Sequence, residues 1–127
     1  MTTTPAFDLS ARLVLASASP RRSQILVDAG LQFDVLPSGI DEKMRAGETP
    51  AELADRLARE KAVDVANRLD SIPAVLVIGA DTIVVVEEDV LGKPRDEAHA
   101  VELLSKLMGT THRVMTGIAL ALSLIHI

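Results

Sequence analysis

The stretch Ala74-Val75-Leu76-Val77-Ile78-Gly79-Ala80-Asp81-Thr82-Ile83-Val84-Val85-Val86 organises the predicted fold. Its first five residues form a nearly continuous apolar run, which is typical of a strand covered on both faces. Residues 83–86 predict a second strand, and the polar residues 79–82 predict a break between the two. The acidic cluster at 87–89 then turns the chain back through residues 90–91 as a hairpin. We therefore expect a group of strands at the centre of the molecule.

A first helix is predicted upstream of this stretch. Ser19 is a favourable N-cap, and Pro20 is tolerated in the first turn because its missing N–H would have no helical partner. Ile25 and Leu26 are expected on the buried face of the helix. Gly30 is expected to end it as the C′ residue.

A second helix is predicted from Thr49-Pro50-Ala51-Glu52, which combines an N-cap, a first-turn proline and a capping box. Apolar residues and small alanines then recur at helical spacing to about Leu69. A third helix follows Asp96 as its N-cap, and Gly109 closes it. Its inward-facing residues are expected to be Val101, Leu104 and Leu107.

Further strands are predicted at residues 13–16, 33–36 and about 112–122. The order is therefore strand, helix, strand, helix, strand pair, helix, strand. This order predicts an α/β or α+β layer fold, with a mixed β-sheet flanked by helices, and we take α/β as the expected class. We expect one domain over residues 11–122, with a flexible leader at 1–10 and an apolar tail at 123–127.

The composition argues against several classes of protein. The 13 basic and 18 acidic residues give a formal net charge of −5, which disfavours a general nucleic-acid binder. The absence of cysteine excludes disulfides and thiolate zinc sites. The apolar runs are shorter than the roughly 20 residues of a membrane helix, and the first ten residues do not resemble a secretory signal. We therefore expect a cytoplasmic protein with no nucleic-acid and no membrane partner.

The segment Ser17-Ala18-Ser19-Pro20-Arg21-Arg22 is the first candidate site, because a strand there gives way to a helix. A helix N-terminus offers free N–H groups and the positive end of the dipole, and Arg21 and Arg22 add guanidinium donors. This pattern favours phosphate binding. A capped helix with two solvated arginines explains the same residues equally well.

Asp81 is the second candidate, because a carboxylate beside buried strands is costly to desolvate unless it is paired or holds a metal. A catalytic base or a metal ligand would explain it. The alternative is a turn aspartate bonded to nearby backbone.

Three more charged residues are weaker candidates. Lys93 follows the hairpin and could bind a phosphate, although a solvated loop lysine is the more common case. Lys61 lies near the apolar seam of the second helix and points either into a cleft or out to water. Asp41-Glu42, in the loop before that helix, could supply a second oxygen ligand for magnesium or manganese, and we favour Glu42, although loop carboxylates are usually only solvated.

Five segments in this order together resemble the motifs of the Maf family, although each alone is weak. They are Leu15-Ala16-Ser17-Ala18-Ser19-Pro20-Arg21-Arg22, Arg59-Glu60-Lys61-Ala62, Gly79-Ala80-Asp81-Thr82-Ile83-Val84, Gly92-Lys93-Pro94-Arg95 and His112-Arg113-Val114-Met115-Thr116-Gly117.

The resemblance implies a nucleotide pyrophosphatase that cuts a nucleoside triphosphate between its α- and β-phosphates with a divalent cation, Mg or Mn. It also implies a fold similar to inosine-triphosphate pyrophosphatases, and dTTP or UTP as substrate. Asp81 would activate the water and, with Glu42, hold the metal. The triphosphate would be bound by Ser17, Arg21, Arg22, Lys61, Thr82 and Lys93. The alternative is a non-catalytic nucleotide-binding or septum-formation regulatory protein.

The resemblance also raises an expectation about the C-terminus, because Maf proteins continue well beyond the Thr-Gly strand. This chain ends after the apolar residues 121–127. We therefore expect a C-terminally truncated or frame-shifted product whose last residues are foreign to the family, and an inactive fragment is the alternative to an active enzyme. An open strand edge favours self-association, so a homodimer is among the expected assemblies.

Overall fold

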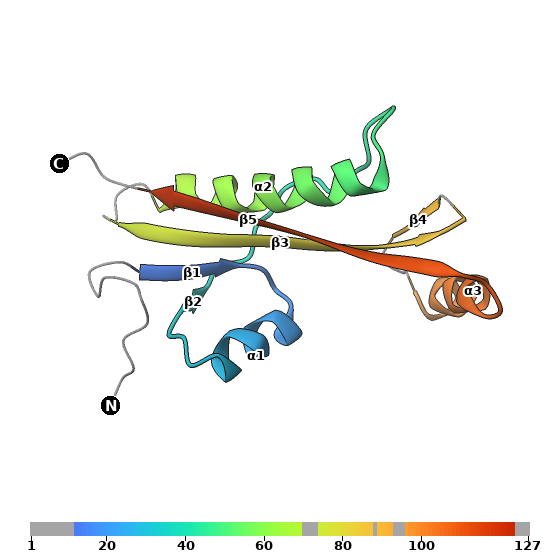
Figure 1. Ribbon diagram of the computed structural model, residues 1–127, viewed down its shortest axis with the longest axis horizontal. Coiled ribbons are helices and arrows are strands. Elements are labelled where there is room, and N and C mark those ends of the chain that lie inside the picture. Colours follow the sequence, from blue (N-terminus) through green and yellow to red (C-terminus); the bar gives the residue numbers. More distant parts are fainter. Residues whose placement is uncertain (1–11, 70–73, 88, 93–95, 124–127) are drawn as a thin grey trace.

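The computed structural model describes residues 12–69, 74–87, 89–92 and 96–123 (Figure 1). The elements in chain order are β1 (Arg12–Ala16), α1 (Pro20–Asp28), β2 (Asp34–Val35), α2 (Pro50–Arg68), β3 (Val75–Val86), β4 (Asp89–Leu91), α3 (Glu97–Leu107) and β5 (His112–Ser123). The predicted class is confirmed, since parallel and antiparallel strands share one sheet with helices beside it.

Strand β3 is the centre of the sheet and runs through residues 79–82, where the sequence predicts a break. Strand β5 pairs with it antiparallel along all twelve residues. This continuous ladder satisfies those backbone groups of the polar segment that face β5, so local polarity does not end the strand. The predicted break is therefore wrong, and Asp81 lies in the middle of a long strand.

The opposite edge of β3 is shared by two short strands. Parallel β1 pairs with residues 75–79, and antiparallel β4 pairs with residues 84–86. Residues 80–83 between them have no partner strand on this edge within the described part of the chain. The sheet edge is therefore open at this point, next to the carboxyl end of β1, and β2 extends the sheet beyond β1.

Helix α2 covers one face of β3 and β5 (Figure 1). It begins with the predicted capping box, in which Thr49 and Glu52 each bond the other's backbone N–H. Its buried stripe consists of Leu53, Ala54, Leu57, Ala58, Ala62, Val65 and Ala66. The alanines allow close approach to two glycines of the sheet. A Cβ on Gly79 would overlap the Ala58 carbonyl oxygen and lie 2.7 Å from the nitrogen of Ala62, and a Cβ on Gly117 would overlap the Ala54 carbonyl.

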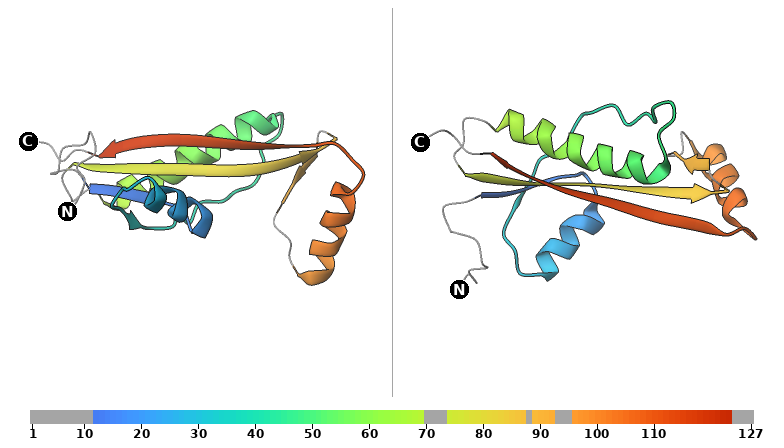
Figure 2. Two further views of the ribbon diagram at one scale, coloured as in Figure 1. Left: turned by 60° about the horizontal axis from the view of Figure 1, so that its bottom comes forward. Right: turned by 45° about the horizontal axis from the view of Figure 1, so that its top comes forward.

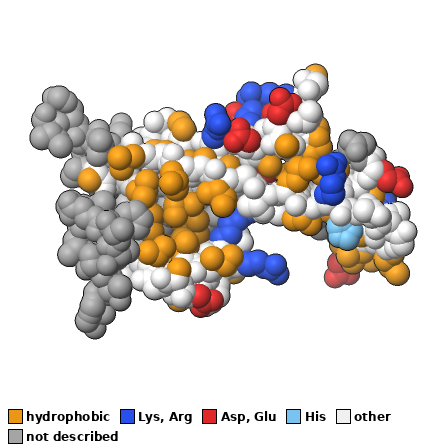
Figure 3. All heavy atoms as spheres, viewed as in Figure 1, with side chains coloured by type: hydrophobic (Ala, Val, Ile, Leu, Met, Phe, Trp, Pro, Cys, Tyr) orange, Lys and Arg blue, Asp and Glu red, His pale blue; other side chains and the backbone are white. Residues whose placement is uncertain are grey.

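Helix α1 lies on the other face of the sheet from α2 (Figures 1 and 2). The two successive right-handed crossovers step in opposite directions across the strand order β2-β1-β3, which puts their helices on opposite faces. The predicted caps are confirmed, with Ser19 as N-cap and Gly30 at φ +81°. The predicted burial of Ile25 is wrong, because 58% of it is exposed. Apolar residues of β5 on the same face, among them Ile118 and Leu120, are also exposed, and Figure 3 shows hydrophobic side chains gathered on the visible face of the molecule.

Helix α3 extends away from the far end of the β3–β5 pair (Figure 2). Asp96 caps it as predicted, its side chain accepting from the His99 N–H. The predicted inward orientation is wrong for Val101 and Leu104, which are 62% and 59% exposed. The predicted helix is confirmed. However, the described part of the chain offers no element on which its apolar side could be buried.

None of the helices in the described ranges is both long enough and apolar enough to cross a membrane. The predicted leader at 1–10 lies outside the described residues, as does the predicted tail apart from Ser123.

Candidate active site

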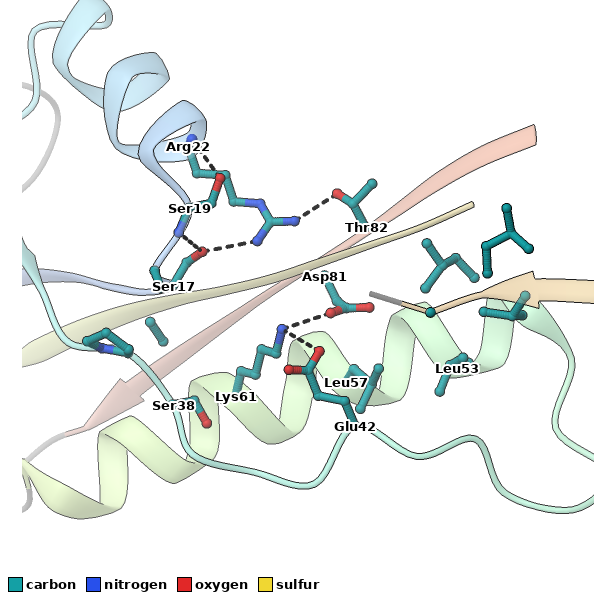
Figure 4. Close-up of a pocket in the computed structure, with 17 residues that line it drawn as sticks. Ser17, Ser19, Arg22, Ser38, Glu42, Leu53, Leu57, Lys61, Asp81 and Thr82 are labelled. Carbon is teal, nitrogen blue, oxygen red and sulfur yellow. Dashed lines mark hydrogen bonds and ion pairs between the residues drawn. The ribbon is translucent and has the colours of Figure 1, made fainter. Parts of the chain in front are cut away.

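The opening in the sheet edge forms a pocket of about 660 Å³ between the end of β1, the end of β4 and helix α2. One end of the pocket is polar and the other is apolar (Figure 4). The apolar end is lined by Leu53, Leu57, Ile83, Val90 and Leu91. The polar end carries Ser17, Ser19, Arg22, Glu42, Lys61, Asp81 and Thr82.

The turn from β1 into α1 builds one wall of the polar end. Ser17 is only 6% exposed, and its Oγ accepts from the backbone N–H of Ser19 at 3.1 Å and from Nη1 of Arg22 at 3.0 Å. The Oγ of Ser19 caps the helix by accepting from the Arg22 N–H at 3.4 Å. The capped helix start therefore aims the Arg22 side chain back across the sheet edge.

Arg22 bridges the gap in the sheet edge. Its Nη1 donates to the carbonyl oxygen of Ala80 at 3.3 Å, and its Nη2 donates to Oγ1 of Thr82 at 2.7 Å. Ala80 lies in the part of β3 that no strand covers on this edge, so the guanidinium supplies a donor where the sheet has none. Thr82 Oγ1 lies in turn 3.0 Å from Oγ1 of Thr116 on β5. Arg22 is thus held as a fixed positive charge beside the pocket.

Asp81 and Lys61 form the opposite wall (Figure 4). Asp81 is 5% exposed, and its Oδ1 accepts from Nζ of Lys61 at 2.8 Å. The same Nζ lies 3.4 Å from Oε1 of Glu42. The ion pair with Lys61 therefore compensates for the desolvation of the Asp81 carboxylate. No side-chain polar atom in the described residues is buried without a partner. The turn interpretation of Asp81 is wrong, and Lys61 points into the cleft.

The residues proposed from the sequence are largely brought together. Six of them line the pocket: Ser17, Arg22, Glu42, Lys61, Asp81 and Thr82. Arg21 is exposed in the first turn of α1 and is not among the lining residues. Lys93 lies outside the described residues. The solvated-arginine interpretation is wrong for Arg22, which is partly buried and bonded to three residues.

Glu42 and Asp81 fit a divalent cation. They are carboxylates from separate segments that converge on one point, since both lie within 3.4 Å of the same ammonium nitrogen. Magnesium is commonly held by one or two carboxylates together with substrate phosphates, so two are sufficient. The described residues contain no group of three His, Asp or Glu side chains that could hold a metal ion alone.

The loop that carries Glu42 is fastened to α2 at both of its ends. At the upstream end, Asp64 accepts from Oγ of Ser38 at 2.8 Å, and Arg68 donates to the Pro37 carbonyl at 2.6 Å. At the downstream end, Arg56 donates to Glu48 through Nε at 2.6 Å and Nη2 at 3.0 Å. These bonds hold the pKa of Glu48 at about 2, well below its ordinary value of 4.5.

Sequence reasoning missed Thr116, Arg56 and Glu48. Thr116 faces Thr82 only because of the β3–β5 register, which no local pattern specifies. Arg56 and Glu48 lie eight residues apart across a helix start, outside the i,i+3 and i,i+4 spacings that identify helical pairs. In the sequence, the one signal of this ion pair is the position of Arg56 beside the apolar stripe of the second helix.

Comparison with known proteins gives consistent matches. The Maf-like protein family model matches residues 12–125. The dTTP/UTP pyrophosphatase of Geobacter sulfurreducens is 53% identical over 108 residues, which are 85% of this chain and 55% of that protein. The dTTP/UTP pyrophosphatase of Vibrio cholerae is 49% identical over 108 residues, which are 85% of this chain and 57% of that protein. The chain therefore spans about half the length of the curated relatives it matches.

The nucleoside-triphosphatase, or dITP/XTP pyrophosphatase, of Mycobacterium abscessus is among the solved structures that align with the chain, with a TM-score of 0.40 and 14% identity over 87% of this chain and 73% of that chain. Similarity at this level supports no argument about function.

Proposed function

Because this chain belongs to the Maf family, we propose that its protein is a nucleoside triphosphate pyrophosphatase. The proposed reaction takes a nucleoside triphosphate and water to the nucleoside monophosphate and pyrophosphate. The observation that carries the proposal is a buried carboxylate, Asp81, that is paired with Lys61 in a pocket which Arg22 also lines. The chemistry needs a base for water and positive charge for the phosphates, and this pocket holds both.

The proposed binding mode follows from the polarity of the pocket. The triphosphate would lie at the polar end, where Arg22 and Lys61 supply charge and Ser17 and Thr82 supply hydroxyls. Arg21 and Lys93 are proposed to reach the outer phosphates. The nucleoside would lie toward the apolar end. Charge spread over the phosphoryl oxygens in the transition state is stabilised by such fixed cations.

Asp81 is proposed as the general base. Its Oδ1 is occupied by Lys61, and no described group bonds Oδ2, which is left for a water molecule in the pocket. The water oxygen would attack the α-phosphorus, its proton would pass to Asp81, and the bond from the α-phosphorus to the bridging oxygen would break. Pyrophosphate leaves with that bridging oxygen. A positioned base of this kind contributes roughly 10² to 10⁴-fold in rate.

Glu42 and Asp81 are proposed to hold a Mg or Mn ion, with Lys61 yielding part of its present position between them. When bound, the cation would neutralise phosphate charge. The remaining charge complementarity would come from Arg22, which is already in place, and from the shifted Lys61 ammonium.

The names of the similar proteins support dTTP and UTP as substrates, since those relatives are dTTP/UTP pyrophosphatases. We place the protein in the cytoplasm, where this proposed activity would clear unwanted nucleotides. The outer edge of β5 has no partner strand in the described residues, which supports the proposed homodimer.

The test is a nucleotide panel on the full-length protein that carries this sequence. With manganese, dTTP and UTP should give monophosphate and pyrophosphate in equal amounts, and faster than CTP or ATP. Phosphorus NMR distinguishes pyrophosphate from orthophosphate. Binding without turnover would favour a non-catalytic nucleotide-binding protein, and release of orthophosphate with a diphosphate would contradict the proposed site of cleavage.

A further inference from the structure

The position of Glu42 depends on a loop without helix or strand. Residues 36–49 connect β2 to α2, and within them only a turn at residues 46–47 is regular. Glu42 itself is exposed, yet its Oε1 lies 3.4 Å from the ammonium of Lys61, whose side chain is 13% exposed. A surface loop of this length samples many conformations unless it is tied down. Besides the contact with Lys61, bonds that fasten the loop to its surroundings are needed to hold Glu42 at this place.

Arg56 contacts this loop at three points. Its Nε donates to Oε2 of Glu48 at 2.6 Å, and its Nη2 donates to Oε1 of Glu48 at 3.0 Å. Nη2 also donates to the backbone carbonyl of Lys43 at 2.7 Å, directly beside Glu42. The remaining nitrogen, Nη1, donates to Glu60 at 2.9 Å on its own helix. One guanidinium thus joins both sides of the loop to α2.

The Arg56–Glu48 contact differs from an ordinary surface ion pair. Its side chains are only 14% and 9% exposed, and the carboxylate is held in a bidentate arrangement. Glu48 also accepts from the backbone N–H of Arg45 at 3.0 Å, which closes the turn. The lowered pKa of Glu48 keeps this carboxylate charged far below neutral pH. Shielded bidentate pairs hold geometry better than solvated ones.

We propose that Arg56 is a positioning residue for the candidate active site, which latches residues 43–48 to α2 and thereby sets Glu42 beside Lys61 and Asp81. The proposal rests on the proposed function for its kinetic consequence. The attachment of residues 43–48 to α2, which we call the latch, does not depend on the proposed function.

Arg59 provides a matched control on the same helix. It makes an ion pair with Asp55 at 3.2 Å, and both side chains are more than half exposed. Arg59→Ala removes the same charge and a similar volume without touching the loop. A difference between the two variants therefore reports the latch and not the loss of an arginine.

The experiment compares Arg56→Ala, Arg56→Lys and Arg59→Ala in the full-length protein that carries this sequence. Trypsin cleaves after Lys43 and Arg45, which lie inside the latched segment, and mass spectrometry identifies the cut. Arg56→Ala should speed these cuts at 20 °C by about tenfold. Its half-saturating manganese concentration should rise by about tenfold, the scale found when a partner of a metal ligand is removed.

A lysine keeps the charge, but it cannot donate to both carboxylate oxygens of Glu48 and to the Lys43 carbonyl at once. The cleavage rate and the half-saturating manganese concentration of Arg56→Lys should therefore lie between those of wild type and those of Arg56→Ala. At saturating manganese the rate of Arg56→Ala should recover to within about threefold of wild type, because the base and phosphate-binding groups are untouched. A role limited to overall stability would not move the metal dependence. Glu48→Gln is the second variant, and serves if Arg56→Ala does not fold.

Equal cleavage of Arg56→Ala and Arg59→Ala at Lys43 and Arg45 would overturn the latch. Faster cleavage with an unchanged manganese requirement would overturn the positioning role. If wild type releases no pyrophosphate, the proposed function fails, whereas the trypsin comparison still decides whether the latch exists.

Discussion

Replacing Gly79 with alanine should separate α2 from the sheet. A Cβ at this position would overlap the carbonyl oxygen of Ala58 and lie 2.7 Å from the nitrogen and 2.9 Å from the Cβ of Ala62. Two of these atoms are helix backbone, so no side-chain rotation relieves the clash. The helix must withdraw from the sheet, and it carries seven of the seventeen buried hydrophobic residues of the described chain with it.

We expect Gly79→Ala to lower the free energy of unfolding by about 3 kcal/mol, at the upper end of the range for overpacked cores. For a domain of this size, that corresponds to a fall of roughly 10 °C in melting temperature. The same shift draws Lys61, the residue before Ala62, away from Asp81 and its 2.8 Å contact. Activity should therefore fall even at temperatures where the variant is folded.

Urea unfolding followed by circular dichroism measures the change, with Gly39→Ala as the control. A Cβ on Gly39 meets nothing within 4 Å, so this variant should stay within about 0.5 kcal/mol of wild type. A Gly79→Ala protein that unfolds at the same urea concentration as Gly39→Ala would refute the close-packing argument.

Three further variants test the charges and the helix start. Lys61→Met leaves the Asp81 carboxylate buried without its partner, so urea unfolding should show a loss of about 3–5 kcal/mol; an unchanged midpoint would mean that the pair does not support Asp81. Glu48 has a pKa of about 2 in the folded chain against an ordinary 4.5, so its stabilising effect is complete above pH 4.5 and is lost as pH falls toward 2. Between these two pH values the melting temperature of Glu48→Gln should accordingly change less with pH than that of wild type. An equal pH dependence of the two melting temperatures would contradict the assignment. Thr49→Ala removes the acceptor for the Glu52 N–H and should cost about 1 kcal/mol in urea unfolding, whereas a neutral result would show that the capping box contributes nothing measurable.

Local signals in the sequence predicted the helix starts well. The caps at Ser19, Thr49 and Asp96 all form as expected, because each depends on residues within one turn. The predicted burial is wrong for Ile25 of α1 and for Val101 and Leu104 of α3, because periodicity shows that a helix has an apolar side but not that anything covers it. The exposed Val101 illustrates the difference.

The break predicted at residues 79–82 failed for a related reason. Gly79 and Asp81 are poor strand residues when judged alone, but β5 pairs across them and α2 requires a glycine at position 79. The cost of burying a charge indicated that Asp81 has a partner. Which cation that is depends on how α2 packs on β3, a long-range property that the local sequence does not contain.

The role of Asp81 is the claim on which the proposed function depends most directly. Asp81→Asn keeps the shape of the side chain and removes its capacity to accept a proton, and Asp55→Asn on the exposed side of α2 is the control. Pyrophosphate release from dTTP by the full-length protein should fall by about 10² to 10⁴-fold in Asp81→Asn, with unchanged release in the control. Pyrophosphate release by Asp81→Asn at the wild-type rate would contradict the account.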